Sequence, residues 1–231
     1  MKFIFKSVIF LFIICCTSYN CFSQGDQIIG NLEGLAEETT YYNLRKALRS
    51  KTTVRKLDLS NQKLTEFPKG IFELKNLVVL IVDSNQIQTI PDQISDLKDL
   101  VIFSISSNEI VELPQTFDRL YQLKYFYLDR NKITKIQPVL CRLPSLIYLN
   151  LGHNKIEVLP SYIKKLGTLK HLQIHNNKIK EIPIEIRSLY DIKVLGLSDN
   201  LISDLPAELF ELKQLEELYV YNNNVISIHP N

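Results

Sequence analysis

The sequence predicts a solenoid of α/β type in which short parallel strands stack one per repeat. A 23-residue phrase recurs from Val54 to the C-terminus without a change of register, and a fixed period in the twenties marks a repeat architecture. Apolar residues at the fourth and sixth positions of each copy alternate with other residues, which is the period of a β-strand. Because no single copy can bury its apolar side alone, neighbouring copies must supply each other's core.

The repeats define the domain organisation. We predict a repeat domain over residues 54–231, made of seven full copies and a partial eighth, preceded by an N-terminal segment over 24–53. The copies begin at Val54, Leu77, Leu100, Leu123, Leu146, Leu169, Ile192 and Leu215.

Two further positions of the repeat explain how the chain leaves each strand and turns; the residues that share one position in successive copies are called a column. The ninth position holds Gln62 and then an asparagine in every later copy, and a buried amide there donates and accepts hydrogen bonds for backbone groups. Proline, which fixes φ and lacks an N–H, suits a turn on the outer arc. It occupies one column at Pro68, Pro91, Pro114, Pro160, Pro183 and Pro206.

The combined pattern, LxxLxLxxNxIxxLPxxIxxLxx, resembles that of the leucine-rich repeat family over residues 54–231. Residues 41–77 also resemble the start of the repeats in secreted bacterial proteins of the leptospiral type. The repeat class is similar to that of the Ras-associated leucine-rich repeat proteins. The resemblance implies a curved right-handed coil with a parallel β-sheet on the concave face and turns or 3₁₀ segments on the convex face.

The chain departs from this pattern at three residues. Gln62 replaces asparagine, Gln137 displaces a proline to Pro138, and His229 displaces another to Pro230. We expect these changes to alter local turn geometry and not the fold.

Residues 1–23 have the pattern of a secretory signal peptide. Lys2 and Lys6 precede an apolar run of about ten residues, which is too short to span a bilayer. We predict cleavage after Ser23 and a secreted or cell-envelope location. The alternative is a lipoprotein anchored through Cys21, the one case in which this chain would lie on a membrane.

Charge and cysteine content exclude two classes of protein. Removing Lys2 and Lys6 with the signal leaves 25 basic and 25 acidic residues, which argues against nucleic-acid binding. Three of the four cysteines lie in the signal, so we expect no disulfide framework. The remaining one, Cys141, is expected to be a small apolar residue of the convex arc.

The two ends of the solenoid need protection. Leu44, Ala47 and Leu48 share one face of a helix expected between about Thr40 and Ser50, which would cap the first repeat. At the other end, the strand near residues 217–220 is expected to be an open edge. That edge is closed by the last partial copy, or it pairs weakly with a second chain.

The strand positions that do not face the core predict a protein-binding surface on the concave face. Tyrosine is enriched in protein interfaces, and an exposed apolar patch usually has a partner. The alternative is that these residue types simply favour strands. The predicted partner-binding residues are Val79, Ile81, Ile102, Tyr125, Tyr127, Tyr148, His171, His175, Tyr219 and Tyr221.

The sequence indicates no enzyme, cofactor or metal site. It contains no glycine-rich phosphate loop and no nucleophile elbow. His171 and His175 are about 13 Å apart if they lie on one strand, too far to share an ion. The expected function is therefore an exported bacterial module that binds a host or envelope protein. The alternatives are an intracellular scaffold of the Ras-associated type and a glycan-binding surface protein.

Overall fold

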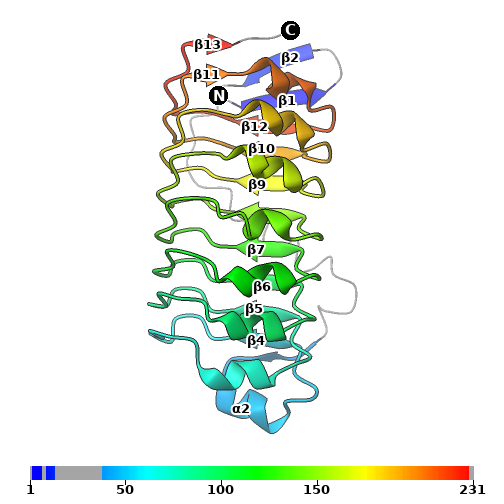
Figure 1. The fold of residues 1–231 in the computed structure, drawn as a ribbon, viewed down its shortest axis with the longest axis vertical. Coiled ribbons are helices and arrows are strands. Elements are labelled where there is room, and N and C mark those ends of the chain that lie inside the picture. Colours follow the sequence, from blue (N-terminus) through cyan, green and yellow to red (C-terminus); the bar gives the residue numbers. More distant parts are fainter. Residues whose placement is uncertain (1, 7–8, 14–37, 229–231) are drawn as a thin grey trace.

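A computed structural model shows a curved solenoid with one strand and one short 3₁₀ segment per repeat (Figure 1). It describes residues 38–227 in full and the backbone of residues 2–6, 9–13 and 228. The predicted cleavage position after Ser23, Cys21, residues 24–37 and the departure at His229 lie outside the described residues.

One face of the solenoid is a parallel sheet in which each strand pairs with the same position of the next repeat. The pairing Val79↔Ile102, Ile102↔Tyr125 and Tyr125↔Tyr148 shows that the register never slips. The repeat strands, in sheet order, are β12 (Glu217–Tyr219), β10 (Val194–Gly196), β9 (His171–Gln173), β8 (Tyr148–Asn150), β7 (Tyr125–Tyr127), β6 (Ile102–Ser104), β5 (Val79–Ile81) and β4 (Lys56–Asp58).

The opposite face consists of 3₁₀ segments, and all of the described ones except the one after Val139 directly follow a proline predicted to turn the chain. The proline φ values lie between −63° and −78°, which is the range that the ring allows. The segments are η1 (Lys69–Glu73), η2 (Asp92–Asp96), η3 (Gln115–Arg119), η4 (Leu140–Arg142), η5 (Ser161–Lys165), η6 (Ile184–Ser188) and η7 (Ala207–Glu211). Sheet, turns and parallel topology confirm the predicted solenoid.

The core runs along the whole solenoid between the sheet and the 3₁₀ segments. It is built from the predicted apolar columns, and most of its side chains are fully buried. Phe103, Phe117 and Phe126 stack in its centre, with ring centroids 4.9–6.3 Å apart. Cys141 belongs to this core as well, and burial raises the pKa of its thiol to about 12. Its expected role as a small apolar residue is confirmed.

The predicted asparagine column forms a continuous ladder of buried amides. Asn154 is representative: its Nδ2 donates to Leu128 O and Leu151 O at 3.0 and 3.1 Å. Its Oδ1 accepts from Ile133 N of the preceding repeat at 2.9 Å. Each amide therefore joins two repeats and acts as both donor and acceptor, as predicted.

The N-terminal cap is shorter than expected and contains one unexpected strand. The helix α2 (Leu44–Arg49) begins at 44 because the Asn43 side chain accepts from Lys46 N at 3.0 Å and caps its first turn. Residues 40–41 form β3 (Thr40–Tyr41), which extends the sheet by pairing with β4. The buried Ala47 and the half-buried Leu44 and Leu48 pack on the core, so the predicted apolar face of the cap is confirmed.

The predicted open edge is occupied in this structure. The backbone of β1 (Lys2–Lys6) pairs antiparallel with β12, and β2 (Ile9–Ile13) pairs with β1. An edge strand presents unpaired backbone groups, which an added strand satisfies. Elsewhere, β11 (Asp204–Leu205) of the seventh copy and β13 (Ser227–Ile228) of the partial eighth copy form a separate parallel pair. The expectation that the edge near 217–220 is open is therefore wrong for the full chain.

Candidate functional site: the concave face

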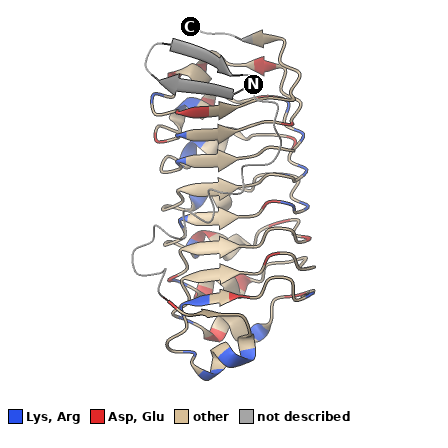
Figure 2. Cartoon of the chain, turned by 180° about the vertical axis from the view of Figure 1, so that it is seen from behind, with Lys and Arg blue, Asp and Glu red and all other residues tan. Residues whose placement is uncertain are grey.

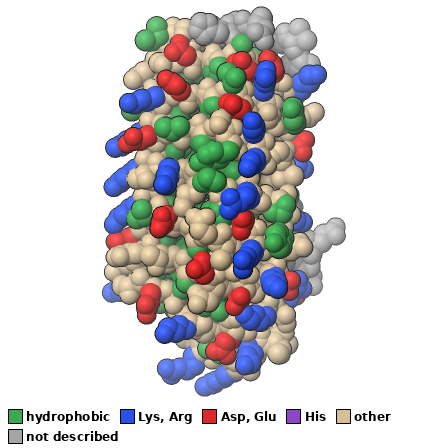
Figure 3. Space-filling view, viewed as in Figure 1, with side chains coloured by type: hydrophobic (Ala, Val, Ile, Leu, Met, Phe, Trp, Pro, Cys, Tyr) green, Lys and Arg blue, Asp and Glu red, His purple; other side chains and the backbone are tan. Residues whose placement is uncertain are grey.

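The concave face of the solenoid is uncharged along its centre. Strands β5 to β10 contain no Lys, Arg, Asp or Glu, whereas charged residues lie on the loops that flank the sheet (Figure 2). The 3₁₀ face instead mixes both charge signs with apolar side chains, some of which gather near its middle (Figure 3). The two faces therefore differ in character, although both are built from the same repeat.

A second apolar cluster, separate from the core, lies on the concave face. Val79 and Ile102 form its floor and are only 3% and 1% exposed. Ile81, Tyr125 and Tyr127 pack against this floor and remain half-buried, so they form its accessible part. The aligned strand register makes the cluster, because it places each of these residues beside its counterpart in the next repeat.

The aromatic row continues across β8 and β9. The rings of Tyr127 and Tyr148 are 4.9 Å apart, and Tyr148 contacts His171 with ring centroids at 5.9 Å. Eight of the ten predicted binding residues thus lie in or next to one region of the sheet. Val79 and Ile102, together with Tyr148 at 5% exposed, are more buried than exposed anchor residues would be.

Tyr219 and Tyr221 do not belong to this region. Tyr219 lies on β12, three strands and about 19 Å from the cluster on β7, and one strand, β10, and about 10 Å from His171 on β9 at the usual strand spacing. Tyr219 instead contacts Glu217 through its hydroxyl group. The structure therefore divides the predicted surface into a central region and a distant end.

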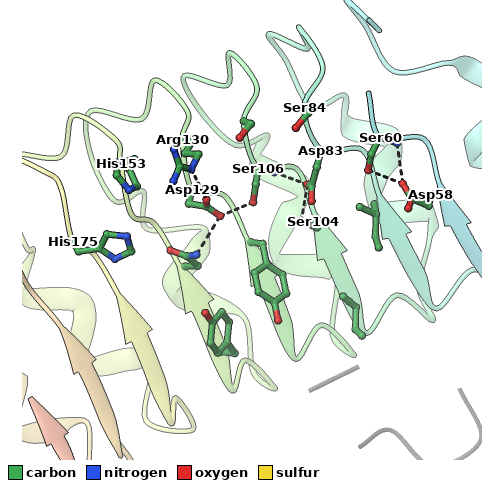
Figure 4. Close-up of a pocket in the computed structure, with 16 residues that line it drawn as sticks. Asp58, Ser60, Asp83, Ser84, Ser104, Ser106, Asp129, Arg130, His153 and His175 are labelled. Carbon is green, nitrogen blue, oxygen red and sulfur yellow. Dashed lines mark hydrogen bonds and ion pairs between the residues drawn. The ribbon is translucent and has the colours of Figure 1, made fainter. Parts of the chain in front are cut away.

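A pocket of about 440 Å³ opens beside the tyrosines, at the carboxyl ends of the strands (Figure 4). One wall is apolar and consists of Ile81, Ile102, Tyr127 and Tyr148. The other wall is polar. It is formed by Asp58, Ser60, Asp83, Ser84, Ser104, Ser106, Ser107, Asp129, Arg130, Asn150, His153 and His175.

Serine hydroxyls and backbone amides fix one oxygen of each pocket carboxylate. Asp83 Oδ1 accepts from Ser104 Oγ at 2.7 Å and from Ser106 N at 2.8 Å. Asp129 Oδ1 accepts from Ser106 Oγ at 2.5 Å, so Ser106 bridges the two carboxylates. Burial raises the pKa of Asp83 to about 6, while the hydrogen bonds from Ser104 and Ser106 oppose that rise.

The three histidines near the concave face do not converge. His153 and His175 make an edge contact at 5.1 Å, and His171 stacks separately on Tyr148. Burial is the main cause that lowers the pKa of all three imidazoles. In the described part of the chain, no three His, Cys, Asp or Glu side chains are placed to hold a metal ion.

The carboxylates of the pocket were not among the predicted site residues. Asp83 and Asp129 share the seventh column of the repeat, where serine stands in three other copies, and this recurrence was the available signal. Arg130 and His153 occupy the next column, which adopts φ between 52° and 59° in all eight copies. Both residues follow the strand ends in this left-handed conformation, and both line the pocket.

Comparisons with known proteins agree with the fold. The sequence model described as leucine rich repeat matches residues 52–110, 103–156 and 122–179, which together span more than half of the chain. No curated protein sequence matches the chain.

Several solved structures are similar to this chain, and three of them illustrate the range. A leucine-rich repeat protein of Leptospira interrogans is 31% identical with a TM-score of 0.61, and the match covers 83% of this chain and 60% of that one. An internalin from Listeria monocytogenes is 27% identical with a TM-score of 0.65, covering 78% and 56%. The ectodomain of a membrane receptor kinase from Arabidopsis thaliana, solved in complex with Casparian strip integrity factor 2, is 31% identical with a TM-score of 0.63, covering 70% and 20%. The chain therefore matches 60% or less of the length of each of these proteins.

Proposed function

The chain belongs to the leucine-rich repeat family, and we propose that it is a non-catalytic module that binds a protein partner through its concave face. The observation that carries this proposal is the contrast between the two faces. An uncharged sheet presents Ile81, Tyr125 and Tyr127 as an accessible cluster, whereas the convex face has the mixed charge of an ordinary solvated surface. Tyrosine on a rigid scaffold contributes contact area with little loss of conformational entropy.

The accessible anchor comprises Tyr125 and Tyr127, with Ile81 beside them, and the buried Tyr148, which we expected to share this role, packs against the ring of Tyr127. The strand backbones are held on both sides by the parallel sheet, so these side chains are presented without reorganisation of the scaffold. His171 extends the anchor towards β10. The repeat strands span about 35–40 Å, which is enough for an interface of ordinary size.

Site-specific photo-crosslinking tests the proposal even when the partner is unidentified. A photoreactive phenylalanine derivative replaces Tyr125 in one sample and Tyr121 in a matched control, because Tyr121 is 61% exposed outside the sheet. We expect a covalent adduct with a discrete protein from position 125 and none from position 121. Adducts from 121 alone would contradict a concave binding face.

Export is proposed on the basis of the N-terminal sequence. Among the described residues, no helix combines the length and apolar character that crossing a membrane requires. The intact mass of the native protein tests the location directly. An N-terminus at Gln24 supports export, a diacylated Cys21 places the concave face at a membrane surface, and an unprocessed Met1 in the cytosol favours the scaffold alternative.

Self-association through the edge strand β12 requires that β1 no longer pairs with that edge. Because β1 pairs with β12, removal of residues 1–23 would free that edge for another strand. Light scattering of the full chain and of a chain beginning at Gln24 measures this. A monomer in both samples at high concentration rules out self-association through the edge.

A glycan ligand remains the second candidate function, because the pocket places Asp and Asn side chains next to tyrosine rings. Such a site could bind sugar hydroxyls while the rings stack on the sugar. Binding of the protein to a glycan array, with loss of the signal in Tyr127→Ala, would favour this function over a protein partner.

A further inference from the structure

We propose that the carboxylate wall of the concave pocket binds a basic side chain, arginine or lysine, of an extended peptide segment whose neighbouring side chains are apolar. This inference rests on the proposed function and specifies the partner chemistry of the same face. It follows from the unused oxygens of the pocket, its charge, and the apolar wall beside it.

The pocket carboxylates are held in place with hydrogen-bonding capacity left over. Ser60 N and Ser60 Oγ donate to Asp58 Oδ1 at 2.9 and 2.6 Å, and Asp83 uses its Oδ1 in the same manner. Within the described residues, Oδ2 of Asp58 and of Asp83 accepts no hydrogen bond and joins no ion pair. Each therefore offers an oriented acceptor to a donor that enters the pocket (Figure 4).

The charge of the pocket is negative and only partly compensated. Among the described residues, Asp58, Asp83 and Asp129 line it together with one cation, Arg130, whose Nε lies 3.7 Å from Asp129 Oδ2. Asp129 is 7% exposed and Asp83 is half-buried, so a cation bound there is poorly screened by water. Burial and the neighbouring carboxylates of Asp129 and Asp58 both raise the pKa of Asp83, which means that they disfavour its ionised form. A bound cation would stabilise that ionised form.

The apolar wall determines what accompanies the cation. Tyr127 and Tyr148 face the same pocket, and a guanidinium or ammonium group can pack its alkyl stem or its charge against their rings. Ile81 and Ile102 continue this wall towards β5, where no charged residue lies on the strands. An apolar side chain next to the basic one fits this part of the surface.

The dimensions favour a peptide segment over a single small cation. A volume of about 440 Å³ exceeds the volume of one side chain, and an extended chain places side chains i and i+2 about 7 Å apart on the same face. A basic residue over the carboxylates would thus carry its next same-face neighbour onto the tyrosine and isoleucine wall.

A peptide selection on the immobilised full chain tests the inference. A displayed library of random hexapeptides is selected on the wild type and on three variants. Asp83→Asn with Asp129→Asn removes two pocket charges while keeping the side-chain shape and the Oδ1 acceptor. Asp96→Asn with Asp118→Asn changes the net charge equally at exposed or partly exposed sites of the 3₁₀ face. Tyr125→Ala with Tyr127→Ala removes the anchor.

We expect the wild type and the 3₁₀-face control to enrich hexapeptides with one basic residue flanked by apolar residues. The pocket variant should lose the basic preference. For a selected peptide, replacement of arginine by citrulline, which is isosteric and neutral, should weaken binding to the wild type about tenfold or more, and to the pocket variant hardly at all.

The outcomes separate this inference from the proposed function. Enriched peptides that need the tyrosines but show no basic preference overturn the inference and leave the proposed function intact. A basic preference that survives in the pocket variant also overturns it. Selection of no peptide by the wild type contradicts both, and binding of a glycan array instead assigns the pocket to sugars.

Discussion

The Asp83 side chain lies in the concave pocket, where burial raises its pKa from 3.8 to about 6. The folded chain therefore holds a proton that the unfolded chain releases between about pH 4 and 6. This contribution to stability is present in full below pH 4 and is lost as the pH rises through 6. At neutral pH the ionised carboxylate weakens the fold, as binding groups often do.

Replacement of Asp83 by Asn should consequently stabilise the protein at pH 7. The amide keeps an oxygen for Ser104 Oγ and Ser106 N and carries no charge. We expect the free energy of unfolding to rise by about 2 kcal/mol at pH 7, with the difference vanishing near pH 4. Urea denaturation at both pH values measures it. A variant that is less stable at pH 7 would contradict the assigned cause.

The buried amide ladder offers a second residue-scale prediction. Asn154→Ala removes the donor to Leu128 O and Leu151 O and the acceptor of Ile133 N. Because these backbone groups are buried, we expect a loss of about 3 kcal/mol. The matched control is Asn223→Ala in the last copy, where the hydrogen bonds are partly buried and a loss of about 1 kcal/mol is expected. Equal losses in urea denaturation would show that burial does not set the cost.

At the residue scale, the sequence predicted side chains whose role repeats in every copy. The asparagine column was identified because seven copies place the same amide at the same position. The pocket carboxylates were missed because Asp83 and Asp129 have no counterpart in adjacent copies, and only the stacking of strands brings them together. The left-handed column was missed because its residue types vary, although its φ does not.

At the scale of elements, the cap helix α2 is the part that protects the first repeat. Ala47 is fully buried against the core, whereas Arg45 on the same helix is exposed. Ala47→Asp should bury an unpaired charge and detach the cap, lowering the free energy of unfolding by about 3 kcal/mol or more. Arg45→Asp, which introduces the same residue at solvent, should cost less than about 1 kcal/mol. Hydrogen exchange should show the first strands opening in the Ala47 variant. Protection unchanged there would contradict the capping role.

Element boundaries could be predicted wherever proline and the apolar period agree. The 3₁₀ segments that follow a proline in the regular column span five residues, whereas η4, which follows Gln137, spans three. Gln137, which stands in the proline column, makes a hydrogen bond that a proline side chain could not make: its Oε1 accepts from Leu113 N of the preceding repeat at 2.6 Å. The strand β3 and the pairing of β1 with β12 could not be predicted, because they lie outside the repeat and no period marks them.

At the scale of the whole molecule, function depends on the difference between two faces that share one repeat. The register of the sheet collects the variable strand positions on the concave side, where they form an uncharged surface with one negative pocket. The same register places charged residues of successive copies next to one another elsewhere, as in the pair Lys193–Glu216 at 2.8 Å. The sequence predicted which positions face the concave side. It could not predict which of these side chains are buried from solvent, because their burial depends on the side chains beside them in adjacent repeats.

The measurement that tests the central claim most directly is the affinity of the crosslinked partner for two matched double variants. Tyr125→Ala with Tyr127→Ala truncates two rings of the concave cluster, and Tyr121→Ala with Tyr190→Ala truncates two exposed rings outside the sheet. We expect the concave variant to weaken binding about thirtyfold or more, as loss of interface anchors does, and the control to leave it within about twofold. If the concave variant binds as tightly as the wild type, the concave face is not the binding surface.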